Sequence, residues 1–225
     1  MKLRDGLLAA GLLVTFCSLP LRADSITNGS FETPVVPVGS FTSFASGSTG
    51  ITGWTVVGAA GGVAVVSGTL TSGSITFPAE AGNQWLDLTG NGTNAIEGVQ
   101  QSFATTAGTQ YTVSFWVGNV FDPNGVFGTT STVDVLLGGT GGTLLLAAEN
   151  ANTTPGTQTW DQFSTTFTAT GSTSTLDFMN ADPASDNSNG LDNVSVNPAV
   201  PEPSTLLLLG SGSLGLLGWA RRKLA

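Results

Sequence analysis

Short runs in which apolar and polar residues alternate fill the central part of the chain. The clearest is 111–117, Y-T-V-S-F-W-V, where Thr112, Ser114 and Trp116 alternate with residues that would face a core. A period of two is that of a β-strand, and a helical period is absent outside the two ends of the chain. Runs of this type are expected at 25–32, 53–58, 63–70, 84–89, 96–106, 110–119, 130–138, 142–149, 160–169, 174–179 and 191–197. Many short strands at this spacing predict an all-β fold, an antiparallel β-sandwich.

The strand patterns place two tryptophans opposite to the predicted core. Trp85 and Asp87 point away from the two leucines of their strand, and Trp116 has the same relation to its own strand. These outward faces would meet either solvent or a second packing layer. We expect Trp54 and Trp160, by contrast, to pack in the core.

The beginning of the chain has the pattern of a secretory signal peptide. Lys2 and Arg4 precede an apolar stretch, and Leu21-Arg22-Ala23 fits a cleavage site. We therefore expect residues 1–23 to be removed on export. The single cysteine, Cys17, lies in this segment, so the remaining chain has no thiol with which to form a disulfide or bind a metal.

The last residues, 200–225, combine three features in a fixed order. Pro201-Glu202-Pro203 is a stiff, non-helical break, because each proline ring fixes φ and removes a backbone donor. Residues 206–220 are uncharged and mostly apolar, but they are fewer than the roughly 20 that span a bilayer. Arg221 and Arg222 follow and would stay on the cytoplasmic side of the inner membrane.

This tail resembles the PEP-CTERM sorting signal of exported bacterial proteins. The resemblance implies an exosortase-type enzyme as a partner, which cuts near Pro201-Glu202-Pro203. Until then, 206–220 would hold the protein transiently in the inner membrane. The product would reach the cell envelope, the cell surface or the extracellular matrix. A plain tail anchor that stays uncleaved is the alternative.

Basic residues are confined to these two end segments. The chain has 6 lysines and arginines, no histidine and 15 carboxylates; between residues 24 and 220 lie 14 of the carboxylates and none of the basic residues. The predicted domain, 24–199, is therefore a polyanion. Nucleic acid is excluded as a partner, because neutralising phosphates requires basic side chains. Anionic lipid surfaces are excluded for the same reason, whereas a cation would be attracted.

Five sequence blocks resemble, in their order, the choice-of-anchor bacterial surface domains and the related plant cell-wall proteins. The blocks are N-G-S-F-E-T-P (28–34), I-T-G-W-T-V (51–56), Q-W-L-D-L-T-G (84–90), Q-Q-S-F-A-T-T-A-G-T-Q-Y-T-V-S-F (100–115) and G-L-D-N-V-S-V (190–196). The resemblance implies one galactose-binding-like jelly roll over 24–199 and suggests carbohydrate binding. Trp85 and Trp116 depart from the pattern of the relatives.

Domains of this group often hold a structural calcium ion between the first and last blocks, and the matching carboxylates here are Glu32 and Asp192. Asp192 has the strand parity of Val194 and Val196, so it would point inward, where an unpaired charge is costly. No basic residue can pair with it. Its partner would be either calcium, the one possible cofactor, or backbone N–H groups.

The composition also bears on function. Without histidine, lysine or cysteine in the domain, nucleophilic triads in their usual forms are excluded, and the carboxylates are scattered, so we expect no enzyme activity. The candidate ligand-binding residues are Trp85, Asp87, Trp116 and Asn119, because sugar rings stack on aromatic faces while polar side chains bind hydroxyls. The ligand would be an exopolysaccharide or a cell-wall glycan. A structural or adhesive component of the biofilm matrix, with no small-ligand site, is the alternative.

Overall fold

The alternating runs form β-strands in the computed structural model, which describes residues 25–58, 61–90 and 96–199. The strands are β1 (Phe41–Phe44), β2 (Thr55–Gly58), β3 (Val63–Ser67), β4 (Thr71–Ser72), β5 (Ile75–Thr76), β6 (Gln84–Asp87), β7 (Glu97–Ala104), β8 (Gln110–Val120), β9 (Ser131–Leu137), β10 (Thr143–Asn150), β11 (Gln158–Thr168), β12 (Thr173–Asn180) and β13 (Gly190–Pro198). None of the described residues lies in a helix. Accordingly, these ranges contain no helix that could span a membrane.

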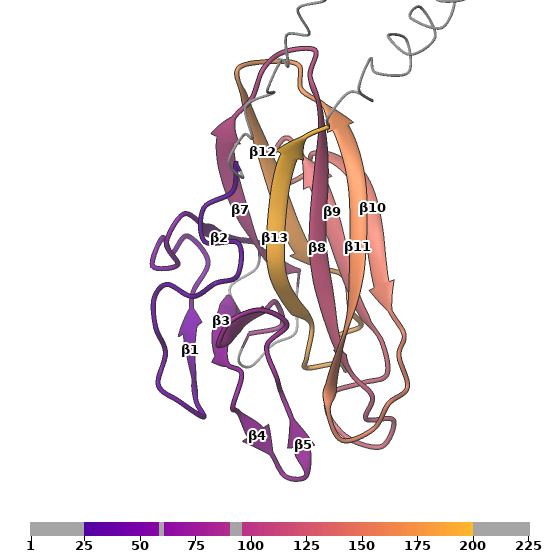
Figure 1. Cartoon of the computed structure of the whole chain (residues 1–225). Helices are drawn as coiled ribbons and strands as arrows, with labels where there is room; N and C mark the ends of the chain where they lie inside the picture. The colour runs from indigo at the N-terminus through magenta and orange to yellow at the C-terminus, as the bar shows by residue number, and fades with distance from the viewer. Residues whose placement is uncertain (1–24, 59–60, 91–95, 200–225) are drawn as a thin grey trace, which may run out of the picture.

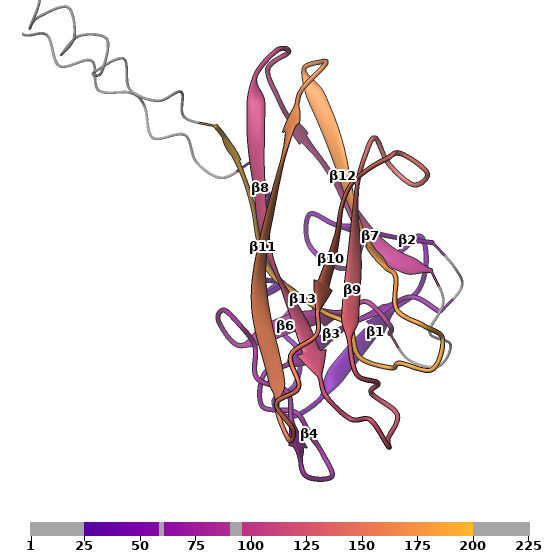
Figure 2. The same cartoon turned by 90° about the vertical axis from the view of Figure 1, so that its right-hand side faces the viewer.

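Two antiparallel sheets pack face to face (Figure 1). The larger sheet has the strand order β1-β3-β6-β13-β8-β11, and the smaller has the order β10-β9-β12-β7-β2. In Figure 2, β8 and β11 lie on one side of the sandwich and β9, β10 and β12 on the other. The short strands β4 and β5 pair with each other and form a separate hairpin, which is joined to the chain before β11 by an isolated bridge between Thr76 and Thr157. The prediction of an all-β antiparallel sandwich is confirmed.

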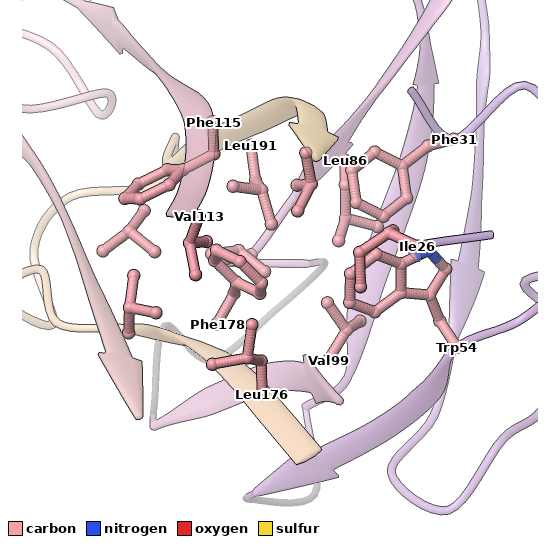
Figure 3. Close-up of a cluster of buried hydrophobic side chains, with 14 of the residues drawn as sticks. Ile26, Phe31, Trp54, Leu86, Val99, Val113, Phe115, Leu176, Phe178 and Leu191 are labelled. Atoms are coloured by element: carbon pink, nitrogen blue, oxygen red, sulfur yellow. The ribbon is translucent and has the colours of Figure 1, made fainter. Parts of the chain in front are cut away.

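The main core lies between the two sheets and follows from the alternation in the strands (Figure 3). On β8, for example, Val113, Phe115 and Val117 are fully buried and contribute to this core. Trp54 is also buried there, and its ring centroid lies 6.0 Å from that of Phe178. Its position in the core is as the sequence predicted.

A second, smaller apolar cluster covers the outer face of the larger sheet. It contains Ala64, Val66, Phe77, Trp85 and Val120, together with partly buried neighbours. The segment between β3 and β6, which includes the β4–β5 hairpin, folds over this face of the sheet. Two indole N–H groups hold it there: that of Trp85 donates to the carbonyl of Phe77 at 3.2 Å, and that of Trp160 donates to the carbonyl of Pro78 at 2.9 Å. Of the two environments open to Trp85, the structure shows the second packing layer.

Trp160 belongs to this second cluster and not to the core between the sheets, where the sequence placed it. Its ring lies against two glycines, Gly118 on the adjacent strand β8 and Gly190 on β13, the strand beyond it. A Cβ atom on Gly118 would come within 2.8 Å of the ring, and one on Gly190 within 2.9 Å. Real Cβ atoms essentially never make contacts this short, so both positions require glycine if the indole is to keep its place.

We therefore expect Gly118→Ala to lower the free energy of unfolding by about 1–3 kcal/mol, the usual cost of overpacking a closely packed site. Denaturant unfolding measures this loss. Gly171→Ala is the matched control, because the nearest atom to its added Cβ is 3.8 Å away. Equal stability of the two variants would contradict the proposed role of the glycine pair.

Candidate functional site

A pocket of about 520 Å³ opens on the outer face of the larger sheet, over the second apolar cluster. Four aromatic residues line it: Phe41, Phe77, Trp85 and Phe127. Polar side chains from three different segments also contribute, namely Thr71, Ser72, Asp87 and Asn187. An apolar pocket with a few convergent polar groups is the usual form of a small-ligand site.

The aromatic rings of the pocket are fixed by contacts with one another. The rings of Phe77 and Trp85 are nearly parallel, with an interplanar angle of 10° and centroids 6.3 Å apart. Phe127 meets Phe77 edge-on at 5.2 Å. Phe41, which is 43% exposed, contributes the most accessible ring of the pocket, whereas Trp85 is only 1% exposed. The pocket therefore has a rigid aromatic wall and one open ring.

Asp87 contributes the only carboxylate among the described residues that line this pocket. Its Oδ1 accepts hydrogen bonds from the backbone N–H and the hydroxyl of Thr89, at 3.0 and 2.7 Å, and from the backbone N–H of Asn189 at 3.3 Å. Burial raises the pKa of Asp87 to about 6; the charge of Glu97 adds to this, and the donors from Thr89 and Asn189 oppose it. The side chain is therefore mostly ionised at neutral pH, within an apolar surrounding.

The structure separates the four predicted ligand-binding residues. Trp85 and Asp87 line the pocket together, but Trp116 and Asn119 do not. Asn119 is fully buried: its amide donates to the carbonyl of Asn152 at 2.9 Å, and its Oδ1 accepts from the hydroxyl of Ser131 at 3.2 Å. Asn119 has the parity of the core residues of β8, so it cannot share a face with Trp116. The sequence interpretation that set them side by side is wrong on this point.

Trp116 lies elsewhere on the outer face of the larger sheet. It is half-buried and pairs across the strands with Gln162 on β11 and Asp192 on β13. The pocket residues that sequence reasoning missed are mainly Phe41, Phe77 and Phe127. Phe77 and Phe127 lie in loop segments, where no alternation marks the direction of a side chain. Phe127 lies in a loop between glycines, and nothing in the sequence there indicated that its ring would line a pocket.

Asp192 lies on the outer face of the larger sheet and not on the core side. Leu191 pairs with core residues, but the register of β13 shifts after Asp192, and Asn193 adopts a φ of 48°. This bulge breaks the parity on which the sequence prediction depended, so Asp192 does not point into the core between the sheets. It is nevertheless fully buried, as the sequence predicted. Its Oδ2 instead accepts hydrogen bonds from the backbone N–H groups of Glu80 and Ala81, at 2.9 and 3.0 Å.

Glu32 binds the same loop a few residues further on. Its Oε1 accepts hydrogen bonds from the backbone N–H groups of Asn83 and Gln84, at 2.7 and 2.8 Å. The side-chain amide of Asn193 also donates to Glu80 at 2.9 Å. The loop 80–84 is therefore held by two carboxylates that come from opposite ends of the chain.

These contacts bear on the calcium ion that the resemblance implied. Both oxygens of Asp192 and Oε1 of Glu32 accept hydrogen bonds from backbone N–H groups. No group of three or more histidine, cysteine, aspartate or glutamate side chains able to hold a metal occurs within the described ranges. The contacts of Asp192 correspond to the second role that the sequence left open, hydrogen bonding to backbone N–H groups.

Asp182 is a further carboxylate with an unusual environment. Its Oδ1 accepts a hydrogen bond from the backbone N–H of Thr132, while its Oδ2 is buried with no hydrogen-bond partner among the described residues. Burial raises its pKa to about 8; the hydrogen bond from Thr132 opposes this, and the charges of Asp186, Asp87 and Glu149 add to it. The neutral form of this side chain is therefore favoured at neutral pH.

We expect Asp192→Ala to lower the free energy of unfolding by about 2–4 kcal/mol, because two backbone N–H groups of the 80–84 loop lose their acceptor. Glu149→Ala, at an exposed position of β10, should change stability by no more than about 0.5 kcal/mol. Denaturant unfolding in calcium and in EDTA distinguishes the two roles of Asp192. The hydrogen-bonded role predicts equal losses in both, whereas an ion would stabilise only the wild type, and only in calcium.

Stability should also depend on pH through Asp87, Asp182 and Asp192. Burial raises the pKa of these side chains above the ordinary value of 3.8, to about 6, 8 and 7 respectively, so the folded state binds protons more tightly than the unfolded state between about pH 4 and pH 8. The stability they contribute is complete below this window and is lost as pH rises, by up to about 1.4 kcal/mol per pH unit for each group. Thermal melts at pH 5 and pH 8 should show the higher melting temperature at pH 5. Asp182→Asn should flatten the curve above pH 6, and an unchanged curve would contradict this assignment.

The predicted sorting residues, Pro201, Glu202, Pro203, Arg221 and Arg222, and the segments 1–23 and 206–220 lie outside the described residues. The tail nevertheless matches a known signal: residues 199–223 fit the PEP-CTERM protein-sorting motif. This match indicates an exported protein directed to the cell envelope. No curated protein matches the chain.

Three solved structures illustrate what the chain is similar to. TmCBM61, in complex with β-1,4-galactotriose, is 17% identical with a TM-score of 0.47, covering 79% of this chain and 99% of its own. The CBM22-1 xylan-binding domain of Paenibacillus barcinonensis Xyn10C is 20% identical with a TM-score of 0.43, covering 74% and 99%. A CBM4 structure is 19% identical with a TM-score of 0.39, covering 77% and 99%.

A family model matches residues 24–197, which is nearly the whole of the predicted domain. The match includes all five sequence blocks on which the resemblance to surface and cell-wall domains was based. That resemblance is thereby confirmed. The chain belongs to the family described as protein of unknown function (DUF642), with a PEP-CTERM sorting motif after the family domain.

Proposed function

We propose that the domain is a non-catalytic carbohydrate-binding module of an exported surface or matrix protein. The observation that carries this proposal is the pocket of about 520 Å³ that combines aromatic rings with hydrogen-bonding side chains. Sugar rings present an apolar face of C–H groups, which packs on aromatic rings, and a periphery of hydroxyls, which need polar partners. The pocket offers both within one concave surface.

The residues that line the pocket are placed so that a sugar could meet both an aromatic ring and hydroxyl groups. Phe41 is the open ring on which a sugar can stack, while Phe77 and Trp85 keep their own ring contacts behind it. Thr71 and Ser72 are exposed on β4, so their hydroxyls are accessible to a ligand. These groups can donate and accept hydrogen bonds without any change in the sheet.

The chemistry of the pocket supports binding more than catalysis. Hydrolysis of a glycosidic bond ordinarily uses two carboxyl groups on either side of that bond. The described lining of this pocket includes one carboxylate, Asp87, and the domain sequence contains no histidine, lysine or cysteine. Binding a sugar without hydrolysing it does not require a second carboxyl group.

The glycan partner would be an exopolysaccharide or a cell-wall polysaccharide outside the inner membrane. The sorting motif supports this location, because an exosortase-type enzyme would process the tail near Pro201-Glu202-Pro203 after 206–220 has held the protein transiently in the membrane. Release would then leave the module in the envelope or the extracellular matrix.

We expect the wild-type domain to bind at least one polysaccharide on a glycan array. Phe41→Ala should weaken this binding by about 1–2 kcal/mol, or five- to thirtyfold, because a stacking ring is lost. Calorimetric titration measures the change. Val38→Ala is the matched control, since Val38 is 86% exposed and lies outside the pocket. If no glycan binds the wild type, the proposal of a carbohydrate-binding module is wrong. The alternative, a structural or adhesive component of the matrix, then becomes the preferred function.

Processing of the tail can be tested on the native protein. The intact mass of the mature protein should correspond to a chain without residues 206–225, since the sorting motif would be cut near Pro201-Glu202-Pro203. The same measurement with Pro201 and Pro203 replaced by alanine should retain the tail. A wild-type mass that includes 206–225 would show that the tail is only an anchor.

A further inference from the structure

Only one of the two carboxylate oxygens of Asp87 accepts hydrogen bonds from the described residues. The three hydrogen bonds to Asp87 all fall on Oδ1, and they come from Thr89 and Asn189. Within the described residues, Oδ2 receives no hydrogen bond, although Asp87 lines the pocket. Placing a charged oxygen against an apolar surface is costly unless a partner is supplied. That partner has to come from outside the protein or from the ligand.

The rest of the domain has no side chain that could supply a positive charge. Between residues 24 and 220 there is no lysine, arginine or histidine, while the same interval contains 14 carboxylates. An anionic ligand, such as a sulfated or uronic glycan, would be repelled by this charge, and a cationic one would be attracted to it. Among the sugars found in polysaccharides, those with a free amino group carry a positive charge.

The aromatic residues of the pocket favour a cation as well. Trp85 lies two residues before Asp87 on β6, so both side chains share one face of the sheet, and both line the pocket. Phe77 and Phe127 stand beside Trp85 in the same lining. A ligand cation within about 6 Å of a ring centroid is attracted by the negative face of the ring. Trp85 and Phe77 are almost fully buried, so the rings that a ligand cation can reach are those of Phe41 and the half-buried Phe127. An ammonium group in this pocket would therefore meet a carboxylate and aromatic rings together.

We infer that the pocket binds an amino sugar with a free ammonium group, a deacetylated hexosamine of a polysaccharide, which donates to Oδ2 of Asp87. The inference rests on the carbohydrate-binding function proposed above and specifies its substrate class. The sugar ring would pack on Phe41, and the ammonium group would point toward β6. N-acetylation removes the charge and the ammonium donor, so the acetylated sugar loses the interaction on which the selection depends.

Glucosamine oligomers, the matching N-acetylglucosamine oligomers and neutral β-1,4-glucan oligomers of equal length test this by calorimetric titration at pH 7 and physiological salt. The wild type should bind the glucosamine oligomer about ten- to a hundredfold more tightly than the other two, the gain expected for a charge-assisted hydrogen bond. Asp87→Asn should reduce this preference to near unity. Asn can still accept the bonds from Thr89 and Asn189 on Oδ1, so the fold should be preserved.

Glu149→Gln is the matched control, because it removes one negative charge at an exposed position of β10 outside the pocket. It should keep the preference. A second measurement needs no variant: the preference of the wild type should disappear as pH rises above the pKa of the sugar amine.

Three results would overturn the inference. Equal binding of acetylated or neutral oligomers would do so while leaving the carbohydrate-binding function intact. An equal loss in Glu149→Gln and Asp87→Asn would show that the preference is a bulk charge effect. Absence of binding to any glycan would remove both the inference and the function on which it rests.

Discussion

The structure depends on how a domain without positive charges satisfies its buried carboxylates. Between residues 24 and 220 no basic side chain exists to pair with an acid, so hydrogen-bond donors have to take that place. Asp192 and Glu32 accept from the backbone N–H groups of the 80–84 loop, and Asp87 accepts from Thr89 and Asn189. A carboxylate that accepts several N–H bonds offsets much of the cost of leaving water. These three carboxylates therefore act as anchors for loops, and the loops determine what the outer face of the sheet becomes.

That anchoring explains why the sandwich has a second apolar layer. The segment between β3 and β6 leaves the sheet, and its return through the 80–84 loop is fixed by Asp192 and Glu32. The indoles of Trp85 and Trp160 bind the carbonyls of Phe77 and Pro78 next to this loop. Polar bonds at the loop and aromatic packing on the sheet thus support each other. The pocket lies where this cover is incomplete, so its rings are held rigid by the same contacts that stabilise the layer.

Much of the sandwich could be predicted from the sequence, because strand alternation reports burial directly. The pattern of 111–117 placed Phe115 in the core and Trp116 opposite to it, and Trp85 and Asp87 were correctly placed on one outer face. The prediction of side-chain direction failed where the backbone departs from a regular strand, because alternation then no longer indicates which side chains are buried. The bulge at Asn193 reversed the side on which Asp192 lies, and the chain around Phe77 and Phe127 carries no period at all. Asn119 was misplaced for a simpler reason, since its odd-numbered position on β8 shares the core parity of Val117 and not the parity of Trp116.

The relative positions of the pocket and the chain ends also bear on function. The backbone N–H of Ser25 donates to the carbonyl of Val196 at 3.0 Å, so the two ends of the described domain lie side by side. Figure 1 shows the β4–β5 hairpin, which contributes Thr71 and Ser72 to the pocket, at the opposite end of the sandwich. The end of β13 and the β4–β5 edge of the pocket therefore lie at opposite ends of the sandwich. Sorting would decide where the protein resides, and the aromatic pocket with its unpaired carboxylate oxygen would decide which glycan it meets there.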